Sequence, residues 1–140
     1  MTDAPPFALE GIDHVVLLVD DMAAARAFYL DVIGCTLERA LPRHGMLQLR
    51  AGASLVDLVD VSGEPGAWAR PEVAGGRNVD HVCLATGRWD EAAMLAWLAA
   101  KGVEIVEEGV NNGARGESLS FYVRDPAGNV IELTGPPEAT

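Results

Sequence analysis

The sequence has few basic residues, only two cysteines and no long apolar segment, and each scarcity excludes a class of protein. The 140 residues include 10 basic and 21 acidic side chains, giving a formal net charge of −11. Because binding to nucleic-acid phosphates requires a basic surface, we expect no nucleic-acid partner. Cys35 and Cys83 form no Cys-x-x-Cys pair. The simplest interpretation is a cytoplasmic protein with reduced thiols.

The apolar run at residues 15–19 is far too short to span a bilayer, since a helix needs about 20 apolar residues to cross one. The first ten residues have neither a basic start nor an apolar core, so we predict no secretory signal and no membrane partner. The apolar content of 49% is sufficient for a real core. The length suits one compact domain, or two small halves that share a core.

An internal repeat is the most informative feature that is present. Asp13-His14 and Asp80-His81 are each followed by an apolar run, about half the chain length apart. The repeat predicts two similar modules, with one histidine at the same place on a strand of each. If a pseudo-twofold axis relates the modules, His14 and His81 can converge on one metal ion. Two unrelated histidines that begin two buried strands are the alternative.

The hydrophobic pattern predicts the same order of elements in both halves. The first half should contain a strand at 12–19, a helix from Asp20-Asp21 to Gly34, and strands at 37–41, 46–50 and 54–61. The second should contain a strand at 79–85, a helix near 89–101, and strands near 103–107, 118–124 and 129–134, with a loop at 109–116. The predicted organisation is a tail at 1–10, a first module at 11–62, a linker at 63–77, a second module at 78–135 and a tail at 136–140.

Several aromatic and thiol side chains have both a structural and a functional interpretation. Phe28, Tyr29 and Trp97 fall on the apolar stripes of the two helices, which predicts core positions. Trp68 lies in the linker, where it would anchor the segment or form a pocket wall. Cys83 follows His81 by two residues on one strand face, so it is either a small buried thiol or a thiolate.

Strand alternation places His14, Asp57, His81 and Glu132 on one face of the predicted sheets. The opposite face is apolar and suited to packing under helices. An isolated buried carboxylate would cost several kcal/mol, so each acid requires a cation, a partner or water. The polar face should therefore line a cavity.

Two neutral imidazoles and two carboxylates suit a divalent ion such as Zn, Ni, Mn, Fe or Co, with positions left for water or substrate. The alternative interpretation pairs the acids with Arg43, Arg50 or Arg124 in an inert cavity.

These residues resemble the vicinal oxygen chelate superfamily, which includes glyoxalase I, fosfomycin-resistance proteins, bleomycin-binding proteins, methylmalonyl-CoA epimerase and extradiol dioxygenases. The similar stretches are residues 11–21, 27–34, 79–82 and 120–133. The resemblance implies an α+β fold of two βαβββ modules that form a cup-shaped, incompletely closed eight-stranded mixed sheet with helices outside. It places the metal at His14, Asp57, His81 and Glu132. Glyoxalase-type members usually carry Glu or Gln at the second position, and Asp57 is one methylene shorter.

The resemblance implies a metal-dependent lyase or isomerase that abstracts a proton beside a metal-bound oxygen of a small substrate. Glu132 would be the base and Asp57 a second one, while Ser120, Tyr122 and Arg124 would contact the substrate. A homodimer is expected, with modules paired within one chain or across two.

The chain departs from lactoylglutathione lyases at Leu18 and Val61, where their arginine and asparagine would fall, so we do not expect glutathione as a substrate. One alternative is an extradiol dioxygenase that uses His14, His81 and Glu132, although the remaining histidine, His44, lies in a first-module turn. A non-enzymatic protein that binds a drug or metabolite is the other.

Overall fold

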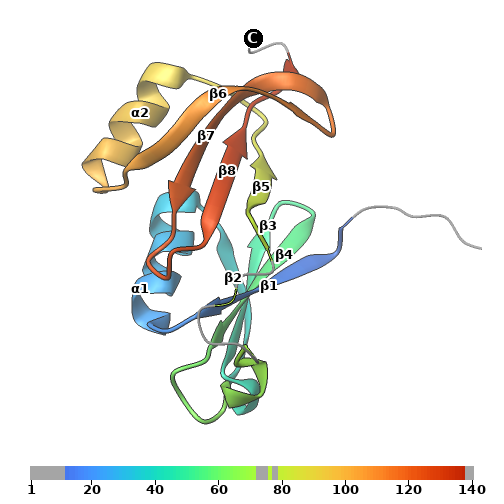
Figure 1. Ribbon diagram of the computed structural model, residues 1–140, viewed down its shortest axis with the longest axis vertical. Helices are drawn as coiled ribbons and strands as arrows, with labels where there is room; N and C mark the ends of the chain where they lie inside the picture. The colour runs from blue at the N-terminus through green and yellow to red at the C-terminus, as the bar shows by residue number, and fades with distance from the viewer. Residues whose placement is uncertain (1–11, 72–75, 77–78, 138–140) are drawn as a thin grey trace, which may run out of the picture.

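The protein consists of two four-stranded sheets with two helices, seen in a computed structural model that describes residues 12–71, 76 and 79–137 (Figure 1). The first module contains β1 (His14–Val19), α1 (Met22–Ala27) with a π-helical continuation η1 (Phe28–Ile33), β2 (Thr36–Leu41), the short turn η2 (Pro42–His44), β3 (Met46–Ala51) and β4 (Ser54–Asp60). The connector contains a short helical turn, η3 (Ala67–Ala69). The second module contains β5 (Val82–Ala85), α2 (Glu91–Ala100), β6 (Ile105–Gly113), β7 (Gly116–Arg124) and β8 (Val130–Thr134).

The two sheets have the same topology. Their strand orders are β1-β4-β3-β2 and β5-β8-β7-β6, with the first pair of each parallel and the others antiparallel. Even an irregularity is repeated, since the register shifts between Leu37 and Arg39 in β2 and between Ile105 and Glu107 in β6. The predicted α+β fold of two βαβββ modules is confirmed.

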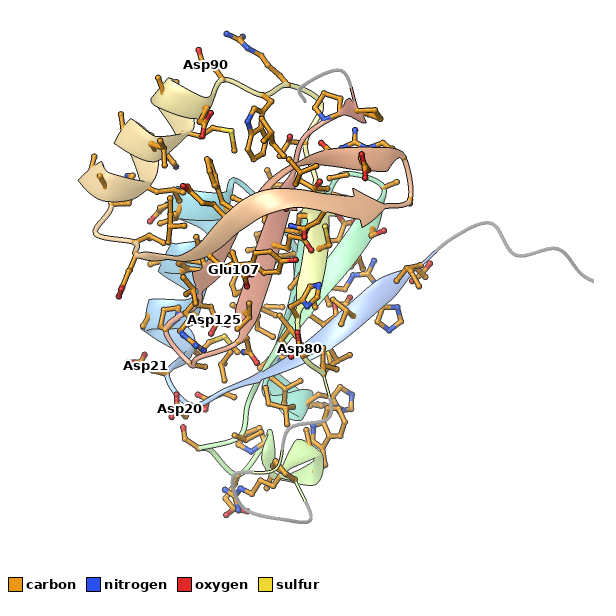
Figure 2. All side chains as sticks on the ribbon, turned by 45° about the horizontal axis from the view of Figure 1, so that its top comes forward. Asp20, Asp21, Asp80, Asp90, Glu107 and Asp125 are labelled. Atoms are coloured by element: carbon orange, nitrogen blue, oxygen red, sulfur yellow. The ribbon has the colours of Figure 1, made fainter. Side chains whose placement is uncertain are left out.

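Local signals set the ends of both helices. The side chains of Asp21 and Asp90 accept hydrogen bonds from backbone N–H groups three residues on, as N-caps do, and Figure 2 shows both at the starts of their helices. Gly34 and Gly102 follow the helical segments with φ values of +94° and +69°, a region that glycine adopts without steric cost.

A single core joins the two modules. The buried cluster includes Leu17, Leu58 and Tyr29 from the first module and Phe121 and Ile131 from the second. Helix α1 and its continuation lie against β7 and β8 (Figure 1). There the buried Tyr29 hydroxyl donates to Asp125, which sits in the β7–β8 turn, over 2.9 Å. The predicted core positions of Phe28 and Tyr29 are therefore confirmed.

Three sequence predictions are wrong. The expected loop at 109–116 belongs mostly to a long β6–β7 hairpin, because pairing with β7 extends a strand that its own Asn and Gly residues disfavour. Trp97 is 49% exposed, because its indole lies at the protein surface, where its N–H donates to the backbone carbonyl of Val32. The side chain of Cys83 is exposed overall rather than buried, although its thiol is partly shielded beside Glu132.

Two further side chains fix connecting segments to the modules. Trp68 donates its indole N–H to the His44 carbonyl over 2.8 Å, which agrees with an anchoring role for the linker tryptophan. The Arg115 guanidinium donates to the carbonyls of Thr86, Thr134 and Gly135, and so holds the hairpin turn against the ends of β5 and β8. Among the described residues, no helix is both long and apolar enough to cross a membrane.

Candidate metal centre

The second module brings a histidine and an acid into direct contact. His81 directly precedes β5, and its Nε2 lies 3.2 Å from Oε1 of Glu132 on β8. Glu132 is only 6% exposed. Asp80, labelled in Figure 2 at the start of β5, lies 2.7 Å from Nδ1 of His81. An acid at Nδ1 orients the imidazole and leaves Nε2 as the nitrogen that can bind a metal.

Two protonated side chains flank Glu132. The strand register places Cys83 on β5 and Tyr122 on β7 directly opposite it. Burial, followed by the Glu132 charge and a hydrogen bond to it, raises the pKa of the Cys83 thiol to about 11. Burial, followed by a hydrogen bond to Glu132, raises the pKa of Tyr122 to about 12. Both groups therefore donate to the carboxylate at neutral pH. The Tyr122 ring also meets His81 edge to face, with 5.3 Å between centroids.

The first module holds a more deeply buried acid. Asp57 on β4 is 1% exposed, and its Oδ2 accepts a 3.1 Å hydrogen bond from Nε2 of Gln48 on β3. Its Oδ1 is buried and has no hydrogen-bond partner among the described residues. Since such an oxygen is costly to leave unsatisfied, Oδ1 is open to a hydrogen-bond donor such as water or to a cation.

His14 lies on the same sheet face as Asp57. Its Nδ1 is 2.7 Å from Asp13, matching the contact between His81 and Asp80. The hydrogen bond to Asp13 is the main reason that the pKa of His14 is raised, and the Asp57 charge adds to the effect. The first module therefore presents an oriented imidazole and an acid close enough to influence it.

The two histidine–acid pairs are equivalent by strand register. In each module the acid lies opposite the residue two positions after the histidine: Asp57 faces Val16, and Glu132 faces Cys83. The next strand places Gln48 beside Asp57 and Tyr122 beside Glu132.

Within one chain these pairs stay separate. Over the described ranges, no group of three or more His, Cys, Asp and Glu side chains is positioned to hold a metal ion. The donor types nevertheless suit a divalent ion, because each pair supplies one imidazole and one carboxylate, and the buried Asp57 oxygen lacks a partner. Arg50, one of the alternative partners considered for the acids, instead pairs with Glu38 at 3.2 Å.

Predicted substrate contacts fall in two places. Ser120 and Tyr122 share the Glu132 face of the second sheet, and Ser120 accepts a 2.7 Å hydrogen bond from Asn111. Arg124 is exposed at the end of β7, where it lines a separate hollow of about 530 Å³ with Lys101 on the helical side.

A second hollow, of about 550 Å³, adjoins His81 and Cys83. Its remaining walls are mainly apolar and come from both modules: Ile12, Val15, Leu55, Val56, Val79, Val82, Leu84 and the alanines and glycine of the β3–β4 turn, with Ser54. A hollow of this size is sufficient for a small organic ligand.

Sequence reasoning missed Gln48 and Asn111. A signal existed for Gln48, because strands at 46–50 and 54–61 form a hairpin about the turn at 51–53. The structure narrows the turn to residues 52–53, with Ala51 opposite Ser54, and counting back from that pair places Gln48 opposite Asp57. Asn111 lay in the segment expected to be a loop, so the sequence offered no register for it.

Comparisons with known proteins agree with this architecture. A model of the family described as Glyoxalase/Bleomycin resistance protein/Dioxygenase superfamily matches residues 11–133. A virulence protein of Salmonella typhimurium is 33% identical over 90% of this chain and 84% of its own. The mitochondrial methylmalonyl-CoA epimerase of Bos taurus is 30% identical over 92% of this chain and 76% of its own. The crystal structure of lactoylglutathione lyase from Agrobacterium tumefaciens superposes with a TM-score of 0.63 at 25% identity, covering 94% of this chain and 96% of the other.

Proposed function

The chain belongs to the glyoxalase/bleomycin resistance protein/dioxygenase superfamily, and from that premise we propose that it is a metal-dependent, glyoxalase-like lyase or isomerase acting on a small molecule. The observation that carries the proposal is the pair of equivalent histidine–acid sites, one of which has a buried carboxylate oxygen without a partner among the described residues.

His14, Asp57, His81 and Glu132 are the residues that would hold the divalent ion. When bound, such an ion stabilises negative charge that develops on a substrate oxygen. Asp13 and Asp80 fix the two imidazole rings through Nδ1.

Glu132 would take the proton from the carbon beside the substrate's oxygen. Its carboxylate is held between Tyr122 and Cys83, so it is oriented before the substrate arrives, and a positioned base is worth about 10²–10⁴-fold in rate. Asp57 would be the second base. Ser120 and Tyr122 would contact the substrate on the same face, whereas Arg124 lines the separate hollow and is left out of the proposed site.

A second copy of the chain would complete the site. Strands β1 and β5, which lie next to the two histidine–acid pairs, each form one edge of their sheet, and edge strands present backbone groups for association with another chain. A twofold dimer would bring the His14–Asp57 pair of one chain to the His81–Glu132 pair of its partner.

Mixing two variants tests the shared site. His14→Ala and His81→Ala should each be inactive alone. After subunit exchange, an equimolar mixture of the two variants should regain about a quarter of the wild-type activity. Random pairing makes about half of the dimers mixed, and one of the two sites in each mixed dimer is intact. No recovery, with exchange verified by mass spectrometry, would place each site within one chain.

The reaction is tested by metal analysis and by a screen with acyl-CoA epimers and hemithioacetals. Glu132→Gln should lose turnover by at least about 10²-fold while it retains the fold, because the amide cannot accept the proton. Near-normal turnover in this variant would rule out Glu132 as the base.

The contact between Tyr122 and His81 favours one second candidate, an extradiol-type dioxygenase that uses His14, His81 and Glu132. Oxygen uptake with catechols and Fe²⁺ would identify it. A protein that binds ligand equally well after chelation, without turnover, would instead belong among the binding members of the superfamily.

A further inference from the structure

Gln48 donates a hydrogen bond to a carboxylate, that of Asp57, which is almost completely shielded from solvent. The hairpin of β3 and β4 places it directly opposite Asp57, and its Nε2 donates to Oδ2 over 3.1 Å. The other oxygen, Oδ1, is buried without a partner among the described residues. One side of the carboxylate is therefore fixed and the other is left for a ligand.

Gln48 satisfies Asp57 without neutralising it. A neutral amide donor stabilises the carboxylate while its negative charge remains, whereas an arginine at the same place would form a complete ion pair. The nearby Arg50 is instead paired with Glu38. Among the described residues, no donor therefore occupies the Oδ1 side of Asp57.

The short side chain of Asp57 makes its orientation important. Aspartate has one rotatable bond fewer than glutamate, and its terminal torsion is broad in the absence of a partner. The hydrogen bond from Gln48 restricts that torsion and so determines where Oδ1 points. In the second module Tyr122 holds the equivalent position beside Glu132.

We propose that Gln48 is a positioning residue that fixes the Asp57 carboxylate so that Oδ1 is presented to the divalent ion. The inference rests on the proposed metal-dependent function and assigns a role to a residue outside the ion's own ligands. Gln48 acts only through Asp57, and this dependence is what the experiment measures.

Zn²⁺ affinity of the metal-free full-length protein, measured by calorimetric titration, is the primary readout. Gln48→Leu keeps the size of the side chain and removes the donor, and it should weaken Zn²⁺ binding by about 10–100-fold, the usual effect of losing a group that orients a ligand. With Co²⁺ in place of Zn²⁺, the visible spectrum should also change. Gln48→Met replaces Gln48→Leu if the latter does not fold.

A double-mutant cycle separates positioning from a general effect on β3. Once Asp57→Asn has removed the carboxylate, adding Gln48→Leu should change the Zn²⁺ affinity less than about threefold, because there is no longer a ligand to orient. Arg50→Gln is the matched control on the same strand and face, and it should not weaken binding.

Three results would overturn the proposal. The first is a Zn²⁺ affinity of Gln48→Leu within about threefold of the wild-type affinity. The second is that Gln48→Leu weakens Zn²⁺ binding as much in the Asp57→Asn background as in the wild-type background. The third is wild-type protein that binds no divalent ion, which would also overturn the proposed function. If the cycle behaves as expected while Glu132→Gln stays active, the proposed reaction fails and the role of Gln48 stands.

Discussion

Replacing Tyr29 with phenylalanine tests whether the two modules pack together as one unit. Tyr29 is fully buried in the first module, and its hydroxyl donates to Asp125 of the second. Burial, reinforced by the Asp125 charge, raises the pKa of Tyr29 well above its usual range, so the hydroxyl remains a donor under all ordinary conditions. Tyr29→Phe removes this hydrogen bond and little else.

The cost follows from the charge and burial of the pair. A buried hydrogen bond to a charged group contributes about 1.5–3 kcal/mol. Asp125 keeps donors from the backbone of Ala127 and from the backbone and side chain of Asn129. Because these donors still satisfy the carboxylate, we expect the lower half of that range, a loss of about 1.5–2 kcal/mol in the free energy of unfolding.

Urea unfolding at one fixed protein concentration measures the loss, since association would otherwise shift the apparent stability. Tyr122→Phe is the matched control, because that hydroxyl lies on the candidate-site face of the second sheet and links no modules. It should cost less than Tyr29→Phe, about 1 kcal/mol, because Tyr122 is only partly buried and the Cys83 thiol still donates to Glu132. Tyr29→Phe within about 0.5 kcal/mol of wild type, below the cost of even a weak hydrogen bond, would refute the packing argument.

Three other predictions can be measured, two that follow from the structure and one from the proposed metal binding. Gly66→Ala should destabilise by about 1–3 kcal/mol or more in urea unfolding, because its Cβ would lie 1.9 Å from the Asp60 carbonyl oxygen, whereas Gly63→Ala meets only an ordinary contact at 3.7 Å. Cys83 should react slowly with iodoacetamide at pH 8 despite its exposure, as followed by mass spectrometry, and the rate should rise about tenfold per pH unit up to its pKa of about 11. Glu132→Gln should lower the pKa of Cys83 and so speed the reaction. Zn²⁺ at about 100 times its Kd should stabilise the protein by about 2.7 kcal/mol, an effect that a chelator reverses in a thermal melt.

The sequence predicts the elements whose signals are local. Asp21 and Asp90 cap their helices, and Gly34 and Gly102 follow their ends, because caps need only a few neighbouring residues. Strand alternation likewise assigns Glu132 correctly to the face that carries Ser120 and Tyr122.

Features that depend on distant partners are not predictable in this way. The β6–β7 hairpin forms across residues with poor strand propensity because each strand completes the other's hydrogen bonds. Trp97 lies at the surface, where its indole donates to Val32 of η1, and helical spacing within α2 does not reveal where η1 packs. Whether the two histidine–acid pairs meet depends on the packing of modules, and a repeat in the sequence fixes each pair but not their separation.

The environments of the two acids differ in a way that favours different roles for them. Asp57 is flanked by Val16, which cannot donate, and by Gln48, whose amide donates at any pH. Glu132 lies between Cys83 and Tyr122, which donate only while protonated and are themselves acids. A carboxylate held by a neutral donor that does not titrate keeps its orientation at any pH, as a fixed ligand requires. A carboxylate bordered by two ionisable donors is instead suited to exchange a proton, since its neighbours strengthen or relax their hydrogen bonds as its charge changes. In the proposed enzyme, the duplicated register would place both acids alike, while the flanking residues would suit Asp57 to holding the metal ion and Glu132 to transferring a proton.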